Sequence, residues 1–143
     1  MITRDFMLRF ARFAFAKEGQ RYDALYCRPV LASAPVSNRR TTYANVEPHF
    51  APEFAAIALP DWSYVPYSAG PPEVLPLIRT TAVPLWTNNT GAALGPFGYL
   101  AVCGTVSGAP ELCWLTRIDP AVSVPPGETL RVPAGITFHM DAV

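Results

Sequence analysis

Residues 97–118, FGYLAVCGTVSGAPELCWLTRI, contain two apolar runs separated by the turn-forming sequence TVSGAP. Strand-forming residues on both sides of a short segment rich in Gly, Ser and Pro are typical of an antiparallel hairpin. If the hairpin is centred near Gly108, Val102 lies opposite Trp114. The stretch therefore predicts two paired strands at the centre of a β-rich fold.

The flanking residues continue this alternation of strands and turns. Turn signals recur as Asn-Asn-Thr-Gly and Pro-Pro-Gly, and no charged residue lies between Arg79 and Glu111. Together these segments predict an antiparallel β-meander over residues 74–140. Its predicted strands are residues 77–86, 97–103, 111–118 and 128–140, with turns at 88–91 and 125–127.

The N-terminal residues carry the one convincing helical pattern of the chain. Ile2, Phe6, Phe10 and Phe13 recur at intervals of three or four positions, which places them on one stripe of a helix. We expect a short α-helix within residues 1–19. Its apolar stripe would pack on the domain itself or on a neighbouring subunit.

Residues 22–30 alternate in a way that predicts a strand. Tyr26 and Arg28 fall on one face of that strand, and Leu25 and Cys27 fall on the other. A second short apolar strand is expected at residues 54–59, just before a Pro-Asp pair.

The segment between these two strands, residues 31–53, is polar, rich in proline and without periodicity. It predicts an extended arm with Arg39 and Arg40 at its exposed tip and Tyr43 beyond them. A connection of this length in a small domain usually serves function or contacts a partner. We therefore count Arg39, Arg40 and Tyr43, with the apolar stripe of the helix, as candidate interface residues.

The composition of the chain limits its partners. Its 143 residues suit one domain with a real core, residues 1–143. Eleven basic and eleven acidic residues cancel, so neither nucleic acid nor an anionic membrane is an expected partner. Only 15% of the residues are charged, against about 25% in average soluble proteins. A chain this poor in charge is typical of proteins that cover apolar surface with a protein partner.

Three cysteines leave two redox states open. Cys27, Cys103 and Cys113 form no CxxC motif, and their odd number argues against a disulfide framework. Buried reduced thiols are the favoured interpretation. A cross-strand disulfide between Cys103 and Cys113 stays an alternative, because the hairpin places the two roughly opposite each other.

The sequence shows no pattern of an active site. His49 and His139 lie far from any cysteine pair, so no zinc site, other metal site or cofactor site is predicted. Nucleophile and nucleotide-binding motifs are missing as well. Carboxylates such as Glu111, Asp119 and Glu128 could form a hydrolase pair, although nothing demands it. Asn88-Asn89-Thr90 matches a glycosylation sequon, which we interpret as a turn.

The order of segments resembles a group of small virion structural proteins of tailed bacteriophages. The likeness spans most of residues 5–138 and rests on turns and core strands. The matching pieces are residues 41–43 (TTY), 54–59 followed by Asp61-Trp62, 87–91 (TNNTG), 98–102 (GYLAV), 112–117 (LCWLTR) and 124–133 (VPPGETLRVP). Denser prolines, the Arg39-Arg40 pair and the cysteines depart from the pattern of the group.

This resemblance implies a non-enzymatic protein made in the cytoplasm of the bacterial host and carried on the capsid surface. Members look like capsid decoration, or cement, proteins that lie across joints between major capsid protein subunits. A homo-oligomer is implied, with a trimer as the first expectation. The implied fold is mainly β: an antiparallel β-sandwich or meander, jelly-roll-like, with one short N-terminal α-helix and proline-rich extended arms.

Three other functions stay open at this point. The first is a tail component, such as a fibre adaptor or a host-contact module. The second is a carbohydrate-binding β-sandwich, which would need exposed aromatic rings in a groove. The third is a hydrolase, which would need two carboxylates at catalytic distance.

Overall fold

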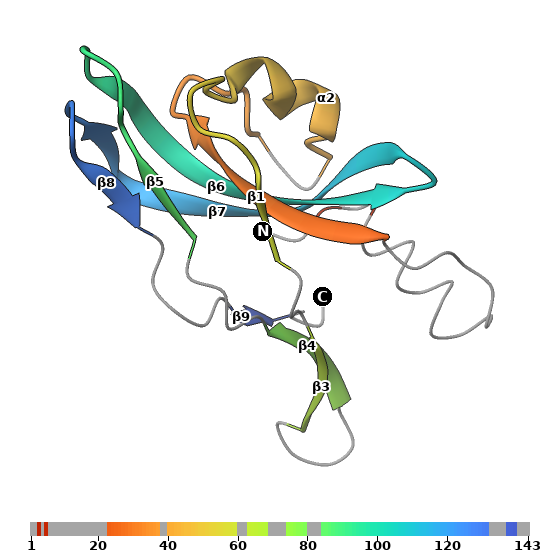
Figure 1. The fold of residues 1–143 in the computed structure, drawn as a ribbon. Coiled ribbons are helices and arrows are strands. Elements are labelled where there is room, and N and C mark those ends of the chain that lie inside the picture. The colour runs from red at the N-terminus through yellow and green to blue at the C-terminus, as the bar shows by residue number, and fades with distance from the viewer. Residues whose placement is uncertain are drawn as a thin grey trace.

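A computed structural model describes Thr3, Asp5 and residues 23–37, 40–59, 63–68, 74–79, 84–131 and 137–139 (Figure 1). The described chain is mainly β, with antiparallel sheets and one short helix. The largest sheet has the strand order β2-β1-β6-β7. Its strands are β1 (Ala24–Leu31), β2 (Ile57–Ala58), β6 (Leu94–Val106) and β7 (Ala109–Val124).

Two smaller sheets and a helical segment complete the described elements. A two-stranded sheet pairs β5 (Leu85–Thr87) with β8 (Thr129–Arg131), and a three-stranded sheet joins β3 (Ser63–Ser68), β4 (Val74–Arg79) and β9 (Thr137–His139). The helical segment consists of α2 (Tyr43–Val46) and the 3-10 turn η1 (Glu47–His49).

The predicted hairpin is confirmed, and it forms one side of the large sheet with β7 at the edge. β6 and β7 pair along most of their length, and Val102 is the Cα partner of Trp114. The turn consists of Ser107 and Gly108, with φ values of 50° and 80°. Two consecutive positive φ values define a type I′ turn, whose twist matches that of paired strands.

A β-bulge changes the register of the hairpin just beyond Val102. Cys103 pairs with Leu112, which leaves Cys113 as the extra residue on β7. Cys103 then belongs to the apolar cluster on one face of the sheet and Cys113 to the cluster on the other. The expectation that Cys103 lies opposite Cys113 is therefore wrong, whereas the favoured interpretation of buried reduced thiols is confirmed, because all three cysteines are free and buried.

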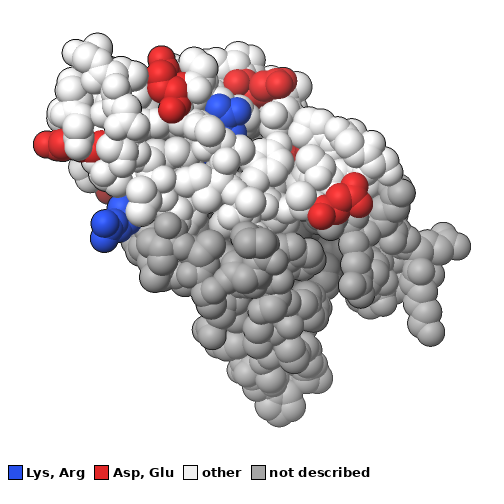
Figure 2. Space-filling view, viewed as in Figure 1, with Lys and Arg blue, Asp and Glu red and all other residues white. Residues whose placement is uncertain are grey.

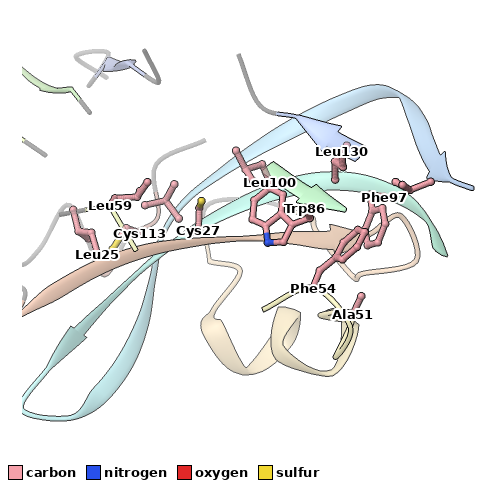
Figure 3. Packing of buried hydrophobic residues seen from close by; sticks show 12 residues of the cluster. Leu25, Cys27, Ala51, Phe54, Leu59, Trp86, Phe97, Leu100, Cys113 and Leu130 are labelled. Carbon is pink, nitrogen blue, oxygen red and sulfur yellow. The ribbon is translucent and has the colours of Figure 1, made fainter. Parts of the chain in front are cut away.

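One face of the large sheet is covered by the β5–β8 ribbon (Figure 3). Phe54 stacks on Phe97 at 5.3 Å between ring centroids and on Trp86 at 6.4 Å. The indole Nε1 of Trp86 donates a hydrogen bond of 2.7 Å to the carbonyl oxygen of Ala55. These contacts connect β5 to the segment that leads into β2. Leu130 of β8 joins the same cluster.

The opposite face is covered by α2 and η1. Val46 and Phe50 are buried there against residues of all three long strands, among them Val30, Ala101 and Leu115. The described part of residues 31–53 thus folds back onto the sheet, whereas an extended arm was predicted. The reason is that two apolar residues four positions apart share one side of a helical turn, where they bury their side chains together.

Two predicted strands are each divided in the structure. Residues 77–86 contribute to β4 and β5, and residues 128–140 contribute to β8 and β9. In each case the two parts belong to different sheets. The strands predicted at residues 22–30 and 54–59 are confirmed as β1 and β2. The helix predicted within residues 1–19 falls outside the described residues, apart from Thr3 and Asp5.

Candidate interaction surface

The structure describes two of the seven predicted interface residues. Arg40 is exposed. Tyr43 is half-buried and packs edge-on against Phe50, with ring centroids 5.8 Å apart at an interplanar angle of 61°. Tyr43 therefore contributes to the core under α2. The other five lie outside the described residues: Ile2, Phe6, Phe10, Phe13 and Arg39.

Many residues of the uncharged part of the sequence are exposed. Apart from Leu85 and Thr87 of β5, they form two groups: Asn89 and residues 91–93 with Gly95 and Pro96, and the hairpin tip at residues 107–110. The residues of both groups are small or uncharged polar residues, whereas Leu85 is a large apolar residue on the exposed side of β5. Much of the described face in Figure 2 is likewise free of charged side chains. Such a surface can approach another backbone closely and loses few water contacts when it is covered.

Asn88 anchors the first of these groups. Its side chain is fully buried, and its Nδ2 donates hydrogen bonds of 2.8 Å to the carbonyl oxygens of both Ala92 and Val124. Its Oδ1 accepts hydrogen bonds from the backbone N–H and the hydroxyl of Thr90, at 2.9 and 2.7 Å. All four hydrogen-bonding positions of the amide are therefore used.

The backbone of Asn88 connects the same turn to the one after β7. The N–H of Asn88 donates to the carbonyl oxygen of Glu128, and the N–H of Gly127 donates to the carbonyl oxygen of Asn88, each at 2.8 Å. Within the second turn, the N–H of Glu128 donates to Pro125, and Gly127 has a φ of 80°. Pro126 followed by a glycine at positive φ makes this a type II turn. The two turns thus form one hydrogen-bonded unit.

The buried position of Asn88 also bears on the sequon. Glycan attachment requires the Nδ2 atom, which here donates two hydrogen bonds inside the protein. The interpretation of Asn88-Asn89-Thr90 as a turn is therefore supported by the geometry.

Two of the buried thiols and the imidazole of His49 have structural surroundings. Burial raises the pKa of the Cys103 thiol to about 12, so the thiol is protonated at neutral pH and is a poor nucleophile. Burial raises the pKa of Cys27 to about 12 as well. His49 is half-buried, and its Nδ1 lies 3.2 Å from the hydroxyl of Ser33.

The three carboxylates considered for a hydrolase are those of Glu111 and Asp119 on β7 and of Glu128 in the turn that follows it. Asp119 and Glu128 are exposed, and Glu111 is half-buried. Within the described ranges, no group of three His, Cys, Asp or Glu side chains is placed to hold a metal ion. Among the same residues, no helix is long and apolar enough to cross a membrane.

Arg28 of β1 is a polar feature that the sequence analysis did not single out. Its Nη2 donates to the carbonyl oxygens of Ala51 and Phe54, at 3.1 and 3.2 Å. Its guanidinium carbon lies 4.6 Å from the centroid of the Phe50 ring. The alternation of residues 22–30 already placed Arg28 on the same strand face as Tyr26. A charged residue on a face that also carries an aromatic residue could have indicated that Arg28 is partly buried.

Neither a protein-family profile, nor a curated protein, nor a solved structure matches this chain.

Proposed function

We propose that this protein is a non-enzymatic structural component of a tailed bacteriophage particle, and that it decorates the capsid as a cement protein. In this role it covers joints between major capsid protein subunits on the capsid surface. The resemblance of its segments to small virion proteins motivates the proposal. The observation that carries it is the exposed, uncharged surface of the two turns and the hairpin tip.

The physical argument is one of desolvation. A cement protein gains affinity by burying surface, and charged groups buried without partners reduce that gain. The hydrogen-bonded unit around Asn88 holds the exposed turn residues in one conformation before binding. Less conformational entropy is then lost when a partner covers them.

The proposal extends to the finer architecture. The β5–β8 ribbon and the large sheet share one apolar cluster, which supports a sandwich-like, jelly-roll-related arrangement of a single domain. The proline-rich arms belong to the proposal too. Candidate contacts to the capsid or to other copies in a homo-oligomer, with a trimer as the first expectation, are Ile2, Phe6, Phe10, Phe13, Arg39, Arg40 and Tyr43.

A tail component is the alternative within the same class of particle. The same uncharged surface would suit a fibre adaptor or a host-contact module. A carbohydrate-binding or hydrolase domain on the virion is a weaker alternative. Of the three carboxylates considered for a hydrolase, Asp119 and Glu128 are exposed and Glu111 is half-buried.

The copy number per particle tests the proposal. Quantitative mass spectrometry of purified virions should give a ratio to the major capsid protein near one, or near one third. A handful of copies per particle would favour the tail alternative, and absence from the particle would contradict both.

The apolar stripe gives a second test. The variants Phe6→Asp and Phe10→Asp should abolish particle binding or oligomerisation. Full retention of both properties by both variants would remove the stripe from the proposed interface.

A further inference from the structure

Arg28 is a positively charged group held in one orientation near the protein surface. Both hydrogen bonds of its Nη2 go to backbone carbonyls, those of Ala51 and Phe54, and its guanidinium lies against the face of Phe50. The segment that leads from η1 to β2 therefore holds the guanidinium on one side, and the side chain as a whole is half-buried.

The remaining nitrogens of Arg28 have no acceptor in the described part of the chain. Its Nε is buried without a hydrogen-bond partner. Its Nη1 is not buried, and it makes no hydrogen bond to a described residue. The guanidinium has five N–H donors, and only two carbonyl oxygens accept hydrogen bonds from it. Partly buried guanidinium groups are normally paired with an anion, because desolvation penalises an unpaired charge.

The titratable side chains that the electrostatics couple to Arg28 do not neutralise it. Two of them interact electrostatically with the guanidinium, the phenol of Tyr26 and the thiol of Cys103, both on the same face of the sheet. Burial raises the pKa of both groups well above neutral pH, so both are uncharged when the guanidinium is charged. Carbonyl dipoles and a ring face supply the only compensation among the described residues.

We propose that Arg28 is a carboxylate-binding site, and that in the particle it receives an Asp or Glu side chain of the capsid subunit on which this protein sits. The accessible Nη1 donates to the carboxylate, which completes the charge pairing that the fold leaves open. The identity of the partner rests on the proposed function, whereas the carboxylate preference rests on the geometry of Arg28.

The first experiment examines the isolated wild-type protein. Side-chain N–H signals of arginine are followed by NMR during titration with sodium acetate, and with sodium chloride at the same ionic strength. We expect a saturable shift of the Arg28 signal with acetate and none with chloride, while Arg131, which is exposed on β8, shows no saturation. Equal responses of Arg28 and Arg131, or no acetate-specific response, would overturn the site.

The second experiment locates the carboxylate. Arg28→Gln removes the charge and keeps a polar side chain of similar stem length, and Arg131→Gln is the matched control. We compare the binding of each protein to particles that lack their own copies of it. Urea unfolding of each variant checks that the two variants are equally folded under the binding conditions. We expect binding roughly tenfold weaker or worse for Arg28→Gln, with a flatter salt dependence, and unchanged binding for the control.

The outcomes separate the two proposals. If the wild-type protein binds particles and Arg28→Gln binds within twofold as well, the proposed contact with a capsid carboxylate is overturned, while the cement function stands. Failure of the wild-type protein to bind particles would contradict the cement function, and the acetate titration alone would then decide whether Arg28 is a carboxylate site.

Discussion

Asn88 offers the sharpest test of the structure. Replacing it by alanine removes four side-chain hydrogen bonds, two donated to Ala92 and Val124 and two accepted from Thr90. Each buried hydrogen bond contributes about 1 kcal/mol net. In the variant the single hydroxyl proton of Thr90 is free to donate to the carbonyl oxygen of Ala92, 2.9 Å away, which offsets part of the loss. We expect the free energy of unfolding to fall by about 3 kcal/mol, or roughly 10 °C in Tm.

The assay is urea unfolding followed by tryptophan fluorescence, with Asn89→Ala as the matched control. Asn89 is the exposed neighbour of Asn88, so its replacement should change the free energy of unfolding by less than about 0.5 kcal/mol. A third variant, Asn88→Asp, keeps an acceptor for Thr90 but turns an anionic oxygen toward two carbonyls. It should destabilise the protein more than alanine does at neutral pH.

The result that would refute this reasoning is a small effect of Asn88→Ala. A loss below about 1 kcal/mol would mean that water or a rearranged turn replaces the hydrogen bonds of the amide. The two turns would then not form the preorganised unit on which the proposed interface depends.

Three further predictions concern a close backbone contact and the thiols. Gly98→Ala should destabilise the protein by about 1–3 kcal/mol, because its new Cβ would lie 2.8 Å from a backbone atom of the β1–α2 connection. The control Gly91→Ala meets no atom within 4 Å and should leave the stability in thermal unfolding nearly unchanged. The folded-state pKa of Cys27 and of Cys103 is raised from 9.0 to about 12, so the stability that each thiol contributes is complete below pH 9 and is lost as the pH rises toward 12. Urea unfolding at pH 8 and pH 10.5 should show this fall, and an unchanged slope in the double alanine variant would contradict its assignment to the thiols. Alkylation of unreduced, denatured protein should label three thiols by mass spectrometry, and a single label would reveal a disulfide between two of the three cysteines.

Local sequence signals predicted the elements whose partners are close in the chain. The hairpin of β6 and β7 and its turn near Gly108 were foreseen, because two apolar runs and two turn residues are enough to specify them. The same holds for the turn at residues 125–128. The alternation of β1 was also correct, with Leu25 and Cys27 on the core side opposite Tyr26.

Long-range packing decided the features that were missed. The bulge that moves Cys113 to the face opposite Cys103 leaves no mark in the sequence, since both residues suit either face. The return of residues 40–53 onto the sheet depends on apolar surface that other strands present. The roles of Asn88 and Arg28 came from contacts with residues far along the chain, namely Val124, Ala51 and Phe54.

The sequence by itself determined that this protein is mainly β, that residues 97–118 form a hairpin, and that no residue from 80 to 110 carries a charge. Those properties follow from residue type and short spacing. Only the tertiary structure decided which cysteine lies on which face, which polar groups are satisfied, and which charge is left without an anion. The physical reason is that these properties depend on the register of strands and the closure of long loops, whose free energies come from contacts between distant residues.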